Sequence, residues 1–255
     1  TLRSFADSRA LAEEAGQAKT AVVLGSGFIG LEVAAPLRHR GLDVHVVSLD
    51  KRPLERVLGV KLGDFLRTLH EGHGVHFHME NSLASIERNR VLLQDGSELA
   101  ADLVLLGVGV RPDTGLAEAA GLAVDHGILV NHHLETAIPG IYAAGDAARW
   151  TDDRGASHRV EHWVVAERQG QLVAENMLAE QPRAFREAPF FWSAHYDVSV
   201  RYAGTAADGF DSVELDGDPA AHDCAARYLK DGRLVAVATI GRDAEALRQA
   251  EVLAG

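Results

Sequence analysis

The chain has 255 residues, 47% of them hydrophobic, which is enough for one or two domains with a sizeable core. Its formal net charge of −12 argues against generic nucleic-acid binding, which needs a basic surface. The single cysteine, Cys224, excludes a disulfide framework and a C-x-x-C redox pair. The longest apolar-looking segment, 21–37, is interrupted by glycines, Glu32 and Pro36. We therefore expect no membrane span and no targeting segment, and a cytoplasmic location.

Two helices are predicted on either side of the segment 21–50. Residues 2–18 carry apolar residues at helical spacing, and a second helix is expected from Pro53 to 72–74. The apolar stripe of this second helix, which we assign to the core, consists of Leu58, Leu62, Phe65, Leu66 and Leu69.

Between these helices, the segment 21–50 predicts a strand–turn–helix–strand unit that binds a dinucleotide. An apolar strand is followed directly by GSGFIG at 25–30, which fits G-x-G-x-x-G. In this context Gly25 allows the tight turn, Gly27 lets a pyrophosphate approach the backbone, and Gly30 lets the helix pack closely on the strand. The helix N-terminus then offers free N–H groups to the phosphates. A glycine-rich turn without a ligand is the weaker interpretation.

The residues after the second strand, expected over 44–47, bear on the choice between NADH and NADPH. The acid that commonly binds the ribose hydroxyls is expected about 20 residues after the glycine motif. Ser48 stands there, with Asp50 two residues further on. Asp50 favours NADH, whereas the following Lys51 and Arg52 could accommodate a 2′-phosphate. The sequence alone does not decide between them, and NADH is the ligand we favour.

Histidines gather after the second helix, at His70, His73, His76 and His78. A metal site is one interpretation, because His76 and His78 share a face of an extended strand. No carboxylate or cysteine completes a ligand set at a recognised spacing, however. We therefore favour a solvated turn followed by a strand, and we expect no metal ligand here or at 132–133.

Short strands and turns are predicted from 83 to 110. Residues 91–93 and 99–103 form a hairpin-like meander around Asp95-Gly96, and 103–110 reads as one continuous apolar strand. Gly107 and Gly109 at its end indicate close approach of a backbone or a ligand, or else ease a sharp bend.

The remaining sequence predicts a turn that places the carboxylate of Asp146 at the end of a strand. A small α+β domain is predicted after it. A helix over 116–123 and a strand over 128–130 precede a buried strand over 141–144, which leads into Gly145-Asp146. Ligands bind at such carboxyl ends of strands in open α/β sheets. A helix is expected over 164–178. From Pro189 onward the pattern is four short strands, at 198–202, 212–215, 224–229 and 234–240, then a helix at 244–253, with turns at 216–217 and 231–232.

Five segments occur in an order that resembles one family: GSGFIGLEVA, GVGVRP, GIYAAGDAA, VEHWVVAERQGQLVAENM and PFFWSAHYD. The chain resembles the FAD-dependent, NAD(P)H-oxidising flavoprotein reductases, specifically the ferredoxin, rubredoxin and putidaredoxin reductase group with its apoptosis-inducing-factor-like members. The resemblance implies an α/β fold with Rossmann-like nucleotide-binding domains and a small C-terminal α+β domain. It places an NAD(P)-binding domain at 1–112, the remaining part of an FAD-binding domain at 113–188, and a C-terminal reductase domain at 189–255.

The resemblance also implies roles for individual residues. Glu32 should lie near the nicotinamide and Gly109 should line the same channel. Asp146 should bind the ribityl–phosphate arm of FAD. Near the isoalloxazine ring we expect Glu161, His162, Trp163 and Trp192, although plain core packing is the alternative for both tryptophans. The cofactor-binding residues expected are Gly25, Gly27, Phe28, Ile29, Gly30, Glu32, Ser48, Asp50, Gly109, Gly145, Asp146, Glu161, His162, Trp163 and Trp192. No catalytic acid or base is expected.

The function implied is transfer of electrons from NAD(P)H through FAD to an iron–sulfur protein of the ferredoxin or rubredoxin type. Without a C-x-x-C pair the electrons should leave singly. The family's first G-x-G-x-x-G, which binds the FAD diphosphate, has no counterpart here, so we expect a fragment that is inactive alone. A non-catalytic NAD(H)-binding or partner-docking module is the alternative. A simple Rossmann dehydrogenase would leave Gly145-Asp146 unexplained. We expect no nucleic-acid or membrane partner, and the sequence leaves a homodimer open.

Overall fold

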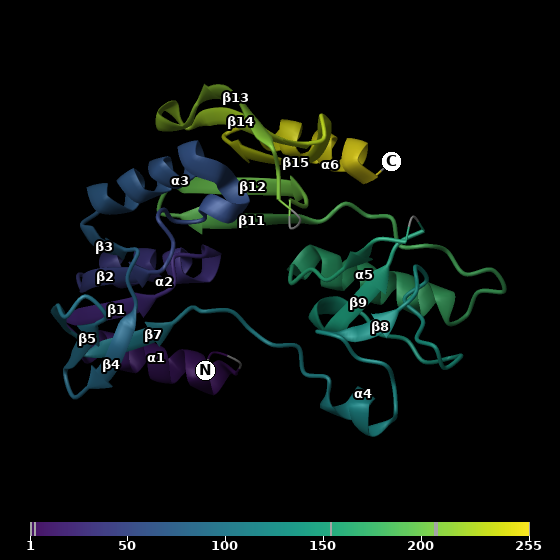
Figure 1. Ribbon diagram of the computed structural model, residues 1–255, viewed down its shortest axis with the longest axis horizontal. Coiled ribbons are helices and arrows are strands. Elements are labelled where there is room, and N and C mark those ends of the chain that lie inside the picture. The colour runs from purple at the N-terminus through teal and green to yellow at the C-terminus, as the bar shows by residue number, and fades with distance from the viewer. Residues whose placement is uncertain (1, 3, 154, 207–208, 255) are drawn as a thin grey trace. The chain divides into compact units, whose positions relative to one another are not determined.

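The computed structural model describes residues 2, 4–153, 155–206 and 209–254 (Figure 1). Arg3, which falls in the first predicted helix, lies outside these residues. Contacts divide the chain into two units. The first comprises the residues up to Gly109 together with Ser193–Val200 and Gly217–Cys224. The second comprises Val110–Trp192, Arg201–Asp216 and the residues from Ala225 onward.

The first unit is built on a parallel sheet with the strand order β3-β2-β1-β7. Its strands are β1 (Thr20–Leu24), β2 (Asp43–Ser48), β3 (Val75–Met79) and β7 (Leu103–Leu106). These short, valine-rich runs suit a parallel sheet that is covered on both faces. The predicted strand over 103–110 is too long, because β7 ends at Leu106. Its second half leaves the sheet at Gly107, and the apolar Val108 is exposed.

Both faces of this sheet are covered, and the two-residue period of β1 separates them. Ala21 and Val23 join a buried cluster with residues of α1 (Phe5–Gln17) and α2 (Phe28–His39). Val22 instead packs with residues of the antiparallel meander β4 (Leu83–Glu87), β5 (Arg90–Leu93) and β6 (Glu98–Ala100). The helix α3 (Glu55–Gly72) packs against β3 and buries Leu58, Leu62 and Leu66 of its predicted stripe.

The second unit contains α4 (Gly115–Ala119), the three-stranded sheet β10-β9-β8 and α5 (Trp163–Asn176). The strands are β8 (Ile128–Val130), β9 (Ala148–Thr151) and β10 (Ser157–His158), and a short 3-10 helix, η1, spans Gly145–Ala147. Trp150 and Phe185 meet edge to face in its core. The predicted buried strand over 141–144 is wrong: the segment makes one isolated bridge, between Glu135 and Tyr142, and is only partly buried.

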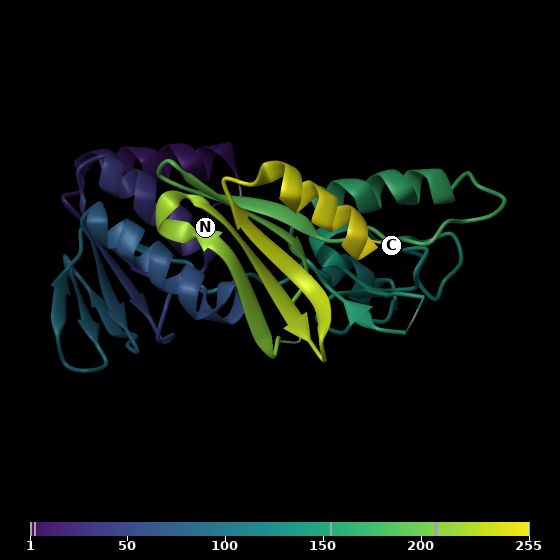
Figure 2. The same cartoon turned by 90° about the horizontal axis from the view of Figure 1, so that it is seen from above.

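The C-terminal strands form a five-stranded sheet with the order β11-β12-β15-β14-β13, and α6 (Asp243–Ala254) packs on β15 (Figure 2). The strands are β11 (Phe190–His195), β12 (Val198–Gly204), β13 (Ser212–Asp218), β14 (Asp223–Lys230) and β15 (Arg233–Ile240). Asp231 and Gly232 both have positive φ and turn the chain between β14 and β15 as predicted. The other predicted turn, 216–217, is wrong, because the chain stays in β13 and turns at η2 (Pro219–Ala221).

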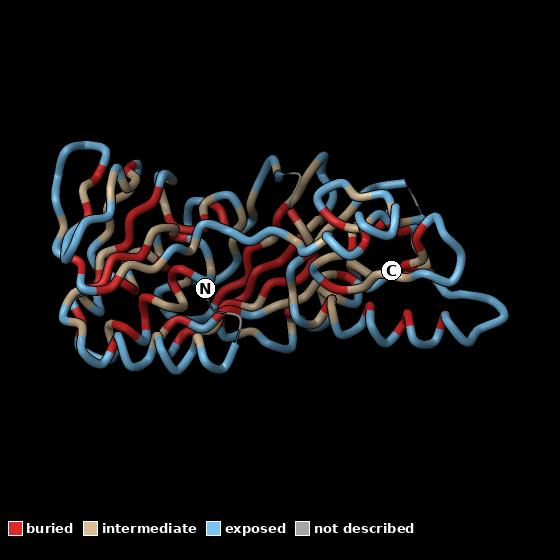
Figure 3. Tube along the Cα trace, turned by 90° about the horizontal axis from the view of Figure 1, so that it is seen from below, coloured by how far each residue is buried: buried red, intermediate tan, exposed pale blue. Residues whose placement is uncertain are grey.

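Buried residues concentrate on the strands of these sheets, and long exposed segments connect them (Figure 3). No helix in the described part of the chain is long and apolar enough to cross a membrane. The α/β fold class predicted from the sequence is confirmed, and the small C-terminal α+β part contains an antiparallel sheet. The three-domain boundaries at 112 and 188 stay a prediction.

Candidate functional site

The glycine loop after β1 is packed so closely that two of its positions have no room for a side chain. Gly25 has a φ of +107°, and a Cβ there would lie 2.3 Å from the backbone oxygen of Gly107. A Cβ on Gly30 would lie 2.1 Å from the backbone oxygen of Gly25. Gly25 and Gly30 therefore bring the first turn of α2 against the ends of β1 and β7.

Gly27 and Gly109, by contrast, face open space. A Cβ at either position would meet no heavy atom within 4 Å. Gly27 is the N-cap of α2, and no side chain caps this helix terminus, where the first turn leaves its N–H groups without helical partners. An open backbone at an uncapped helix start is a cradle for a phosphate, so these residues fit a dinucleotide.

Ser48 and Asp50 lie where β2 ends, next to the glycine loop. The hydroxyl of Ser48 is buried and accepts a hydrogen bond of 2.9 Å from Ser26 Oγ, which ties the loop to the end of β2. Asp50 is partly exposed and its carboxylate pairs with Arg56 at 3.2 Å. Of the basic residues that could take a 2′-phosphate, Arg52 is held by Asp64 at 2.7 Å and by Glu55 at 3.4 Å.

Glu32 lies on α2, two residues after Gly30, and is partly buried. Its Oε1 accepts a hydrogen bond of 2.6 Å from Ser193 Oγ on β11, a contact across 161 positions of sequence. Sequence reasoning did not find Ser193, because nothing local to PFFWSAHYD indicates which side chain it meets. The neighbouring Phe28 is partly buried and Ile29 is exposed.

In the second unit, the Gly145-Asp146 turn is fixed on α5. Gly145 has a φ of +78°, and its N–H donates to Oε1 of the fully buried Gln169 at 2.8 Å. Asp146 is exposed, and its backbone oxygen accepts a hydrogen bond from Arg159, which also pairs with Glu161 at 2.6 Å. The turn therefore leaves the Asp146 side chain exposed while its backbone is anchored. Gln169 could have been suspected only as a polar residue on the inner face of a helix.

The aromatic residues expected near a flavin are not core residues. Trp163 is 81% exposed and Trp192 is 56% exposed, so the core-packing interpretation of both is wrong. The ring of His162 packs at a tilt against that of Phe191, with 4.4 Å between the ring centroids and 48° between their planes. Burial lowers the pKa of His162 to about 4, which makes it neutral at pH 7. His162 Nδ1 and Gln169 Nε2 are among the buried polar atoms of this unit that have no hydrogen-bond partner. Such atoms fit the presence of a polar cofactor.

The histidine cluster differs from the solvated turn we predicted. His70, at the end of α3, is fully buried. It extends the buried stripe of Leu58, Leu62 and Leu66 at four-residue spacing, a signal that could have placed it. His76 and His78 share a face of β3 as predicted, and His78 Nε2 lies 3.0 Å from His45 Nδ1 on β2. Among the described residues, no group of three or more His, Cys, Asp or Glu side chains could hold a metal ion.

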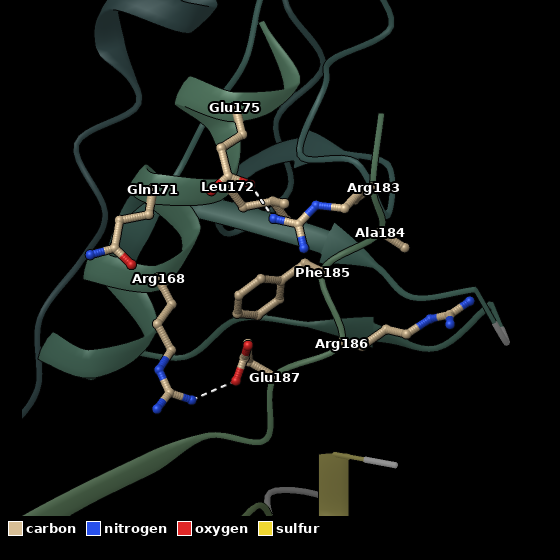
Figure 4. A pocket seen from close by; sticks show the side chains of 9 residues that line it. All are labelled: Arg168, Gln171, Leu172, Glu175, Arg183, Ala184, Phe185, Arg186 and Glu187. Atoms are coloured by element: carbon tan, nitrogen blue, oxygen red, sulfur yellow. Dashed lines mark hydrogen bonds and ion pairs between the residues drawn. The ribbon is translucent and has the colours of Figure 1, made fainter. Parts of the chain in front are cut away.

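A pocket beside α5 lies away from these residues (Figure 4). It lies between α5 and the segment 183–187, and none of the predicted site residues lines it. Its three arginines are paired with acids: Arg168 with Glu187 at 2.5 Å, Arg183 with Glu175, and Arg186 with Asp153 at 2.8 Å. With these charges neutralised, the pocket does not form an anion site.

Comparison with known proteins decides the family. Residues 1–170 match the family model described as pyridine nucleotide-disulphide oxidoreductase, and residues 190–254 match the reductase C-terminal domain. The chain belongs to the pyridine nucleotide-disulphide oxidoreductase family. Within this family the predicted resemblance to ferredoxin reductases and apoptosis-inducing-factor-like proteins is confirmed.

Three similar proteins show how far the match extends. The ferredoxin–NAD(+) reductase component of the anthranilate 1,2-dioxygenase system of Burkholderia cepacia is 38% identical and aligns with 97% of this chain. Apoptosis-inducing factor 3 of Mus musculus is 36% identical over 92% of the chain. The crystal structure of a ferredoxin reductase from Rhodopseudomonas palustris superposes with a TM-score of 0.91 at 35% identity over 96% of the chain. The chain spans 63%, 40% and 62% of these three proteins.

Proposed function

We propose that this chain carries the NAD(P)H site and part of the flavin site of a reductase that passes electrons through FAD to an iron–sulfur protein. The observation that carries the proposal is the glycine cradle. Gly25 and Gly30 are closed by backbone contacts, whereas Gly27 is open at an uncapped helix N-terminus. Backbone N–H groups in this geometry bind the pyrophosphate of a dinucleotide.

In the first unit, the proposed nicotinamide nucleotide runs from Asp50 to Glu32 across this cradle. Asp50 would bind the adenosine ribose, with Ser48 supporting the loop through Ser26. Phe28 and Ile29 would donate backbone N–H groups at the start of α2. Glu32 and Gly109 would face the nicotinamide end, where Gly109 leaves space for a ring.

In the second unit, residues of the Gly145-Asp146 turn and two exposed tryptophans would hold FAD. Asp146 would accept hydrogen bonds from the ribityl–phosphate arm, and Glu161, His162, Trp163 and Trp192 would surround the ring. When bound, FAD supplies the chemistry that takes two electrons as a hydride from NAD(P)H and passes them on one at a time. The ferredoxin reductases among the relatives support an iron–sulfur acceptor, because that partner is stated in their names. The boundaries at 112 and 188 and a cytoplasmic location belong to the same proposal.

Anaerobic visible spectroscopy tests this function. The purified chain is incubated with excess FAD, freed of unbound cofactor by gel filtration, and titrated with NADH. The proposal departs here from the inactive fragment expected from the sequence, because Asp146 and the aromatic residues of the flavin site are present. It expects retained flavin bands that bleach on adding NADH and recover when an oxidised ferredoxin is supplied. Retained flavin that NADH leaves unchanged would contradict electron transfer. NADH binding without any flavin retention would favour the non-catalytic binding module instead.

Asp50 should set the preference for NADH over NADPH. Asp50→Asn removes a charged partner of the ribose hydroxyls, and a hydrogen bond to a charged group contributes about 1.5–3 kcal/mol. NADH affinity should therefore fall about tenfold or more. NADPH affinity should rise, because Arg56 loses its ion-pair partner and becomes free for a 2′-phosphate.

Dissociation constants for both nucleotides, measured by fluorescence titration, check this expectation. Asp125→Asn is the matched control, since Asp125 forms a comparable surface pair with Arg149 in the other unit. The control should leave both constants unchanged. An unchanged NADH-to-NADPH ratio in Asp50→Asn would refute the role given to Asp50.

A further inference from the structure

Four polar side chains of the first unit form a hydrogen-bonded line that ends on Glu32. His70 Nε2 lies 3.2 Å from His195 Nδ1, and His195 Nε2 lies 3.1 Å from Ser193 Oγ. Ser193 Oγ then donates to Glu32 Oε1 at 2.6 Å. His70, His195 and Ser193 are each at most 1% exposed. This line therefore lies out of water for most of its length.

The direction of every hydrogen in this line follows from the donor count. Ser193 has one hydroxyl hydrogen, which it gives to Glu32, so its oxygen must accept from His195 Nε2–H. A neutral His195 then has an unprotonated Nδ1, which accepts from His70 Nε2–H. Both histidines are consequently Nε2–H tautomers, and His70 Nδ1 is left without a partner, as the structure shows.

Neutral histidines are what this environment favours. Burial lowers the pKa of His195 to about 4, and burial together with His195 and His73 lowers that of His70 to about 3. A second proton on His195 would sit on Nδ1 and would face the Nε2–H of His70, so that two donors would oppose each other. The line therefore has one arrangement at neutral pH, with every donor pointing toward the carboxylate. Successive hydrogen bonds of this kind polarise and strengthen one another.

The placement on β11 and α3 explains why this line is rigid. Ser193 and His195 alternate on β11, so they share its buried face, while the exposed Trp192 and Ala194 point the opposite way. His70 ends the buried stripe of α3. Two packed elements thus fix one oxygen of Glu32, whose carboxylate keeps further lone pairs for a ligand.

We propose that the line from His70 through His195 and Ser193 holds the Glu32 carboxylate in one orientation toward the nicotinamide end of the dinucleotide site. Ser193 and His195 are positioning residues for NADH, which they do not touch. This inference rests on the proposed function, because it takes Glu32 to face the nicotinamide. Its chemical consequence is specific: a fixed carboxylate favours a ligand that carries an amide donor at that end over one that lacks the nicotinamide.

Calorimetric titrations of the full chain with NADH and with ADP-ribose, which lacks the nicotinamide, test the proposal. Ser193→Ala should weaken NADH binding about tenfold, the loss expected for one hydrogen bond to a charged group. ADP-ribose affinity should stay unchanged and thereby report an intact fold. His195→Leu should act like Ser193→Ala. His195→Gln keeps an N–H that can reach Ser193 Oγ, and it should bind NADH within about twofold of the parent chain.

Other outcomes overturn the proposal in distinguishable ways. Unchanged NADH affinity in Ser193→Ala, or equal losses for NADH and ADP-ribose, would reject the positioning role and leave the proposed function standing. A parent chain that is folded but binds neither ligand would reject the proposed function and this inference with it. Nitrogen-15 NMR of the histidine rings gives a readout independent of any ligand. It should show Nε2–H tautomers for His70 and His195, and an Nδ1–H tautomer at either would contradict the line.

Discussion

Gly27→Ala should fold like the parent chain and lose dinucleotide binding, whereas Gly30→Ala should destabilise the first unit. The two glycines lie three residues apart in the same motif, but their surroundings are opposite. A Cβ at Gly30 would lie 2.1 Å from a backbone oxygen, and one at Gly27 would meet nothing within 4 Å. Gly27 also has an ordinary negative φ of −75°, so alanine brings no backbone strain there.

The expected magnitudes follow from these surroundings. In Gly30→Ala, backbone must move to admit the methyl group, and overpacking of this kind costs about 1–3 kcal/mol or more. For a chain of this size the melting temperature should fall by about 2–12 °C. In Gly27→Ala the methyl group occupies the space over the helix start. Loss of one or two charge-assisted hydrogen bonds to phosphate should lower NADH affinity about 10- to 1000-fold.

Thermal melting followed by circular dichroism and NADH titration of the same samples separate the two effects. Gly16→Ala is the control: Gly16 lies in α1, has no neighbour within 4 Å of its Cβ position and is exposed. It should keep the binding of the parent and should not lose stability, because alanine is favoured over glycine in a helix by about 1 kcal/mol. Equal NADH affinity in Gly27→Ala and the parent would show that the open face at Gly27 is not a phosphate site.

Acid should unfold this protein well above the range in which carboxylates titrate. Three histidines with strongly lowered pKa values are held neutral in the folded state, at about 3 for His70 and about 4 for His162 and His195. The pKa values of His45 and His78 are lowered in the same direction by burial. The ordinary value in an unfolded chain is about 6.5. Between these values the unfolded state binds more protons than the folded state, so stability falls as pH falls.

The pH window and the size of the loss can both be stated. Above pH 6.5 the three histidines are neutral in both states and leave the free energy of unfolding unchanged. As the pH falls from 6.5 to 4, the free energy of unfolding decreases progressively. Each histidine should cost about 3 kcal/mol by pH 4, because each unit of pKa difference corresponds to about 1.4 kcal/mol. Two of the three protons are taken up in the first unit and one in the second. The carboxylates with lowered pKa, such as Asp102, titrate below this window.

Urea unfolding at a series of pH values measures this dependence. The free energy of unfolding should drop steeply between pH 6.5 and 4.5. His195→Gln should reduce the slope of the free energy of unfolding against pH by about one proton. A free energy of unfolding that stays constant from pH 7 to pH 5 would mean that the buried histidines are not held neutral.

Much of the fold was predictable because its signals are local. The G-x-G-x-x-G segment lies between a strand and a helix, and the glycines at 25, 27 and 30 show the packing and the open face that this motif requires. Strand–helix alternation and the Asp231-Gly232 turn were likewise readable from neighbouring residues.

The errors and omissions arose where long-range contacts decide the structure. The run 103–110 is uniformly apolar, but the strand ends where Gly107 meets Gly25 and Gly30. Ser193 and His195 become candidate functional residues only through their contacts with Glu32 and His70, which lie more than 100 residues away in the sequence. No local periodicity encodes such pairs. The exposure of Trp163 and Trp192 likewise depends on which surfaces the tertiary fold leaves uncovered.

Equilibrium dialysis of the purified chain against NADH tests the central claim most directly, because the glycine cradle of the first unit needs no flavin to bind a dinucleotide. The account predicts one NADH bound per chain, displaced by ADP-ribose, with NADPH bound more weakly. A chain that gives a cooperative thermal transition yet retains no NADH would contradict the claim that residues 25–32 form a nicotinamide nucleotide site.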